Sequence, residues 1–173
     1  MPLLDVLRYL TAVVLTGVLI WAAVSDVRDR RIPNKAVLSV LGLFGLWAVA
    51  NGGAGLASAV VAGAIAFAVA YGLYVFKIVG AGDAKLFAAL ALFAGVSHLP
   101  LFALATVWTG GLMALVSLAA SPRRAMIIFA MRGQGDHGRG IPYGVAIGVG
   151  AAVVLWGYLS GVLPLTVQSL RIG

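Results

Sequence analysis

The chain has 173 residues, of which 62% are hydrophobic and 10% charged, and its mean hydropathy is +1.09. A soluble domain of this size cannot bury that much apolar surface, so the composition indicates an integral membrane protein with one domain over residues 1–173. The absence of cysteine excludes disulfides, a cysteine-ligated zinc and a catalytic thiol. The net charge of +7 lies in loops between apolar stretches. This pattern indicates contact with anionic lipid and a defined topology, not nucleic-acid binding.

The apolar stretches predict about six membrane-spanning helices. A helix needs about 20 apolar residues to cross the core of a bilayer, and the alternating pattern of a membrane β-barrel is missing. The expected fold class is therefore all-α, a polytopic membrane helix bundle. The predicted spans are residues 8–25, 36–50, 56–76, 84–97, 100–120 and 142–164.

The basic residues predict which ends of these spans face the cytoplasm. They gather in every second loop, whereas the turns at 51–55 and 95–99 contain neither Lys nor Arg. The positive-inside rule puts the basic loops in the cytoplasm, so we expect a multi-pass protein of the bacterial inner membrane with both termini outside. The basic residues concerned are Arg28, Arg30, Arg31 and Lys35, then Lys77 and Lys85, then Arg123, Arg124, Arg132 and Arg139.

Two segments have alternative interpretations. The short polar start, the apolar run and Ala22-Ala23 also resemble a signal peptide, whose cleavage would remove a span and break the alternation of charge. The stretch 121–132 mixes arginine with large apolar residues. It is either an amphipathic helix at the membrane surface or a solvated connector.

Two aspartates are the candidate functional residues. Asp26 closes the first predicted span and Asp83 opens the fourth. Because these spans run in opposite directions, both carboxylates are expected at the cytoplasmic border. Ionisable groups at such positions are costly and are functional candidates by default. Taken singly, Asp83 could cap its helix and Asp26 could pair with Arg30, so it is their shared depth that favours a common site.

A pair of close carboxylates suits one kind of chemistry. Such a pair shares one proton, so that one member can activate water while the other donates to a carbonyl oxygen. Hydrolysis of an amide by this route needs no metal and no other cofactor. Gly80 and Gly82, beside Asp83, are expected to allow backbone conformations closed to other residues and to leave room for a peptide strand.

The segments around the two aspartates resemble a known family. Gly-x-Gly-Asp-x-Lys at 80–85 and Asp-x-Arg-x-Arg-x-Ile-Pro-Asn at 26–34 resemble the two signature motifs of the type IV prepilin peptidases, which are aspartyl proteases of the GxGD type. The short, stand-alone peptidase of Tad/Flp pilus systems is the most similar form. The likeness extends to Ile-Pro-Tyr-Gly at 141–144.

The resemblance implies that Asp26 and Asp83 are catalytic. The implied reaction removes the short basic leader of a prepilin or pseudopilin, after a glycine, on the cytoplasmic side of the inner membrane, with contact to the pilus assembly machinery as a further implication. Longer members of the family also methylate the new terminus and carry a Cys-x-x-Cys insertion. Here the 26–34 motif follows the first span directly and cysteine is absent, so neither a methyltransferase nor a Cys-rich insertion is expected.

Three basic residues are candidates for binding substrate. Substrates of the family usually carry a glutamate shortly after the cut, which Lys85, Arg28 or Arg30 could receive. The alternative for Lys85 is a contact with lipid phosphate. The alternative function for the whole chain is a small proton- or ion-coupled transporter with Asp26 and Asp83 as relay groups.

Overall fold

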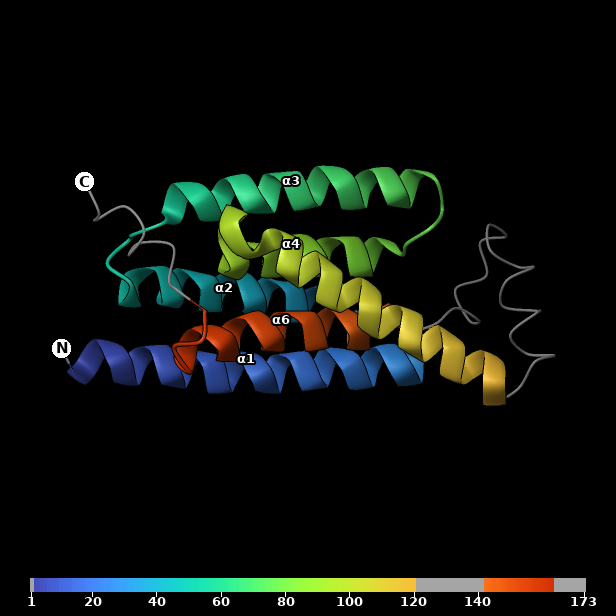
Figure 1. Ribbon diagram of the computed structural model, residues 1–173, viewed down its shortest axis with the longest axis horizontal. Helices are drawn as coiled ribbons and strands as arrows, with labels where there is room; N and C mark the ends of the chain where they lie inside the picture. Colours follow the sequence, from blue (N-terminus) through green and yellow to red (C-terminus); the bar gives the residue numbers. More distant parts are fainter. Residues whose placement is uncertain (1, 121–141, 164–173) are drawn as a thin grey trace.

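A computed structural model describes residues 2–120 and 142–163 (Figure 1). All regular secondary structure in these two segments is helical, which confirms the predicted all-α class. The elements run along the long axis of the molecule as a bundle. They are α1 (Pro2–Asp29), α2 (Asn34–Ala50), α3 (Leu56–Val75), α4 (Ala81–Ala120) and α6 (Tyr143–Leu159).

Helix α4 is bent back on itself at a single residue. Gly95 has φ 63° and ψ 175°, a conformation that is essentially restricted to glycine. Figure 1 shows the chain reversing direction at this point. The rings of Phe87 and Phe102 stack with centroids 4.6 Å apart, whereas a straight helix would separate these residues by about 22 Å. The two arms correspond to the predicted spans 84–97 and 100–120.

The predicted turn at 95–99 was therefore wrong in its extent. Only Gly95 leaves the helical conformation, and Pro100 lies within the helix that follows. Five helices are present in the described part of the chain, and the count of about six membrane spans stays a prediction. The stretch 121–132 lies outside the described residues.

Side chains of neighbouring helices form hydrogen bonds with the polar groups that the bend leaves without a helical partner. The Val96 N–H donates to Ser58 Oγ on α3 at 3.0 Å. The Tyr158 hydroxyl on α6 donates to the Ala94 carbonyl at 2.7 Å and also contacts His98 Nδ1 at 2.9 Å. In an apolar surrounding each unpaired group would be costly. These bonds therefore hold the bend of α4 between α3 and α6.

The packing has the pattern of a protein in lipid. Many buried residues are alanine, as at Ala12, Ala62 and Ala91, while large apolar side chains such as Val107 and Trp108 are 70% and 75% exposed. Small residues let membrane helices approach closely, and lipid accepts the large ones. Three helical segments are long and apolar enough to cross a bilayer, namely Leu3–Asp29, Leu56–Val75 and Ala81–Ala120. The chain is accordingly a helical membrane protein.

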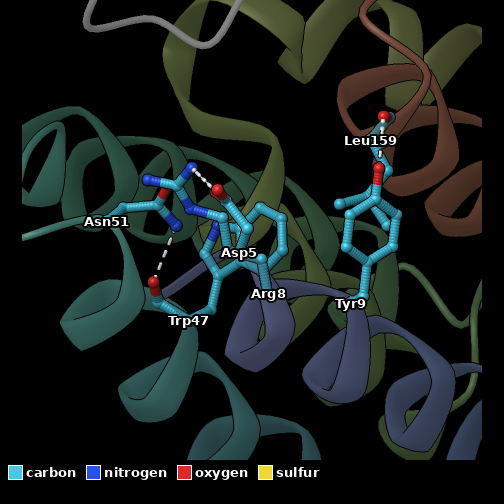
Figure 2. Close-up of polar contacts among 6 residues, drawn as sticks. All are labelled: Asp5, Arg8, Tyr9, Trp47, Asn51 and Leu159. Carbon is cyan, nitrogen blue, oxygen red and sulfur yellow. Dashed lines mark hydrogen bonds and ion pairs between the residues drawn. The ribbon is translucent and has the colours of Figure 1, made fainter. Parts of the chain in front are cut away.

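Figure 2 shows the end of the bundle where α1 begins. The Tyr9 hydroxyl donates to the Leu159 carbonyl at 3.3 Å, which ties the start of α1 to the end of α6. Beside it, Arg8 and Asp5 form an ion pair of 3.0 Å, and the Asn51 amide donates to Trp47 O at the end of α2. Since α1 and α6 are antiparallel, the end of α1 meets the start of α6 at the opposite end of the bundle.

Candidate active site

Asp26 lies at that opposite end of the bundle, on α1, with its side chain facing α6. Its side chain is only 7% exposed, and its Oδ2 accepts a hydrogen bond of 2.7 Å from the Gly144 backbone N–H. Gly144 stands in the first turn of α6, where backbone N–H groups have no partner within the helix. The carboxylate therefore occupies the positive end of the α6 dipole, where negative charge is stabilised.

The turn that follows α1 places the positively charged Arg30 beside Asp26. Arg30 has φ 53°, unusual for a residue with a side chain, and its N–H donates to the Asp26 carbonyl at 3.1 Å. The Ser25 hydroxyl donates to Arg31 O at 3.0 Å and fixes the same turn. The Arg30 guanidinium interacts electrostatically with the Asp26 carboxylate. Helix α2 then begins directly after Pro33, two residues before the start of the predicted span 36–50.

Asp83 lies in the first turn of α4, three residues after Gly80. The Gly80 N–H donates to its carboxylate, as in one half of a capping box, so the expected capping contact is present. The other oxygen, Oδ1, is buried and has no hydrogen-bond partner among the described residues. The Asp26 and Asp83 carboxylates are close enough to interact electrostatically. The structure thus brings the two predicted residues together at one end of the bundle.

The glycines of the site are required for space. Neither Gly80 nor Gly82 has a positive φ, so the expected special conformation was wrong. A methyl group at Gly80 would lie 3.0 Å from Asp83 Oδ2, and one at Gly82 would lie 3.1 Å from Ile32 Cβ. Gly82 therefore lets the start of α4 pack directly on the segment that follows Asp26.

Gly144 is a site residue whose contact with Asp26 the sequence did not predict. A methyl group there would meet Asp26 Oδ2 at 2.9 Å, Cβ at 3.1 Å and Cγ at 3.2 Å. The sequence signal was present in the Gly-x-x-x-Gly spacing of Gly144 and Gly148, which is typical of close helix packing. Gly148 faces Leu19 of α1, whose Cβ is 3.9 Å from the position of an added methyl group.

The basic residues named as candidates for substrate binding have different surroundings. Arg30 is half-buried and lies beside Asp26, as described above. Arg28 is exposed on α1 and lines a groove between α1 and α6. Lys85 is exposed on the first turns of α4. Residues 2–120 and 142–163 contain no cluster of three potential metal ligands.

Taken together, fold and site define a helical membrane protein with a pair of buried or half-buried aspartates at one end of its bundle. The chain belongs to the type IV leader peptidase family, whose model matches residues 13–115. The match covers more than half of the chain and includes both segments that carry the aspartates. Membership makes the chain a peptidase, a hydrolase, and implies a prepilin-type substrate. Comparison with curated proteins and with solved structures gives no match.

Proposed function

We propose that the chain is a membrane aspartyl endopeptidase that cleaves the basic leader of prepilin-like substrates. The observation that supports this most directly is the pairing of Asp26 and Asp83, each held by a backbone N–H of a glycine. Two carboxylates that interact electrostatically, one of them with a buried oxygen that no described residue binds, provide an acceptor and a donor for one water and one carbonyl.

The proposed reaction uses the two carboxyl groups in turn. The ionised member takes a proton from water as the water oxygen attacks the scissile carbonyl carbon, and the protonated member donates to the carbonyl oxygen. The resulting tetrahedral species collapses by breaking its C–N bond: the protonated carboxyl group donates its proton to the departing amine, and the ionised one takes the proton of a hydroxyl group as the carbonyl re-forms. Arg30, beside Asp26, would keep that side chain oriented throughout.

The proposed location is the bacterial inner membrane, with the site on the cytoplasmic side. The support is the charge pattern: Arg28 lies in the last turn of α1, Arg30 and Arg31 follow that helix, and Lys85 is two residues after Asp83 in the sequence. A site at this border can meet a leader peptide that stays in the cytoplasm while the following apolar segment enters the bilayer. Assignment to a Tad/Flp pilus system, contact with the assembly machinery and a single-domain chain without methyltransferase activity belong to the same proposal.

Transport is not favoured by any observation. Both aspartates lie at one end of the bundle, whereas coupling sites of transporters usually lie near the middle of the membrane. A test in reconstituted vesicles separates the two functions, because a relay predicts proton or ion flux without any peptide substrate.

Cleavage of a purified prepilin-like substrate tests the proposal. The unmodified protein should cleave after the leader, and Asp26→Asn and Asp83→Asn should each lower kcat by about 10³-fold or more. Asp29→Asn is the matched control, since Asp29 is an exposed carboxylate at the end of α1, the helix that carries Asp26. Equal losses in all three variants would count against a specific pair.

A further inference from the structure

An open groove of about 440 Å³ runs between α1 and α6, beside the candidate active site. Apart from Thr16 and Arg28, its lining is apolar, and it includes Leu19, Ala23, Gly148 and Ala152. From Thr16 to Arg28 the groove follows α1 for about 18 Å, more than half of the hydrocarbon core of a bilayer. It is therefore long enough to hold several turns of an apolar helix.

One end of the groove lies near Asp26, although neither aspartate lines it. Val145, which lines it, directly follows Gly144, whose N–H binds Asp26. Gly148 lies one turn further along α6 and packs beside Leu19, which also lines the groove. A chain lying in the groove thus reaches the border of the membrane next to Asp26.

The charge at that end restricts the occupant. Arg28 is the one charged residue of the lining, and it stands at the end of the groove nearest the active site. An apolar helix with an acidic side chain near the end that lies beside Arg28 is complementary both to the apolar lining and to the positive charge. The small side chains of Ala23, Gly148 and Ala152 allow such a helix to approach closely, as at other helix contacts in membranes.

We infer that the α1–α6 groove binds the apolar helix of the substrate that follows the scissile bond, with Arg28 pairing with an acidic side chain near its start. The inference rests on the proposed peptidase function and adds a docking site to it. It also favours Arg28 over Lys85 as the residue that binds the acidic side chain of the substrate, since Lys85 does not line the groove.

Crosslinking tests the position of the substrate directly, because the chain contains no cysteine. In an Asp83→Asn background, Ala23→Cys or Ala152→Cys is combined with a substrate carrying one cysteine in its apolar helix. A disulfide should form between the substrate cysteine and the introduced cysteine in each of the two variants. Trp21→Cys is the matched control: it lies at a similar depth on α1, is 45% exposed and does not line the groove.

Filling the groove tests its contribution to activity. Gly148→Leu should raise KM by about tenfold or more, since part of a buried apolar contact is lost, and should leave kcat within about threefold. Gly45→Leu is the control, because Gly45 is exposed on α2 and an added side chain there meets nothing within 4 Å. The crosslinks provide a second measure if Gly148→Leu fails to fold.

The outcomes separate the two proposals. Cleavage by the unmodified protein together with the two crosslinks and a raised KM supports the groove. Cleavage without crosslinks at Ala23→Cys and Ala152→Cys overturns the groove and leaves the peptidase function standing. The proposed docking site is also overturned if a photoreactive phospholipid labels these positions and added substrate does not lower the labelling, since the occupant is then lipid. Failure of the unmodified protein to cleave contradicts the proposed function itself, and the inference with it.

Discussion

The Gly144 backbone N–H binds the Asp26 carboxylate at 2.7 Å across a sequence separation of 118 residues. This bond joins the first and last described helices at the candidate active site. It gives the start of α6 a specific role: α6 binds the carboxylate through a backbone N–H and not through one of its side chains.

Replacing Gly144 by alanine should displace Asp26. The added methyl group would lie 2.9 Å from Oδ2 and 3.1 Å from Cβ, so the side chain must shift. A misplacement of this size lowers kcat by about 10²-fold while KM changes little, because binding elsewhere is unaffected. Steady-state kinetics on a prepilin-like substrate measure both values.

Gly148→Ala provides the control for this prediction. Its methyl group would meet only Leu19 Cβ, at the ordinary contact distance of 3.9 Å. If Gly144→Ala and Gly148→Ala had the same kcat as the unmodified protein, Gly144 would have no positioning role.

Gly82→Ala should also impair cleavage, by pushing the start of α4 away from the segment after Asp26. Its methyl group would lie 3.1 Å from Ile32 Cβ and 3.5 Å from Ile32 N, and backbone atoms cannot rotate away. The expected result is a loss of activity of about tenfold or more with the fold retained. Gly72→Ala, at an open position of α3, should keep full activity in the same assay. Full activity of Gly82→Ala would show that the two segments need no close contact.

Gly95→Ala should destabilise the protein as a whole. Alanine at φ 63° and ψ 175° is strained, and the bend of α4 depends on this conformation. The expected cost is about 1–3 kcal/mol, visible as a lower Tm in detergent. Ser58→Ala, which removes the partner of the Val96 N–H, should lower Tm by a comparable amount. An unchanged Tm in both variants would mean that the bend contributes nothing to stability.

Charge reversal should distinguish Arg28 from Lys85. Arg28→Glu should weaken cleavage of a substrate with an acidic residue near the cut, and a substrate with lysine at that position should restore part of the loss. Lys85→Glu should show additive losses with the same substrates, because Lys85 does not line the groove. The double-mutant cycles measure the coupling of each pair. Coupling to Lys85 and none to Arg28 would reverse the assignment.

The sequence predicted the class of fold and the meeting of the two aspartates for physical reasons that are local. Apolar length marks helices, and basic loops mark one side of the membrane, so Asp26 and Asp83 could be placed at one border without any contact being known. The same reasoning misjudged the turn at 95–99. Residues 95–99 were all assigned to the turn, whereas one glycine in a conformation closed to other residues, Gly95, is sufficient.

The remaining features of the site depend on contacts between distant segments. The hydrogen bond between Gly144 and Asp26 cannot be predicted from a hydrophobicity pattern, because glycine contributes only its backbone. The groove likewise exists only because α1 and α6 lie side by side. The role expected of Gly82, conformational freedom, differs from the one observed, which is close packing on Ile32.

The central claim is that Asp26 and Asp83 act as one site. It is tested most directly by the cleavage rates of Asp26→Asn, Asp83→Asn and the double variant, measured on one substrate with folding checked by Tm. If the two residues act together, each single variant loses about 10³-fold or more, and the double variant is no slower than the slower single variant. A single variant that retains the unmodified rate, or losses that multiply in the double variant, would contradict the claim.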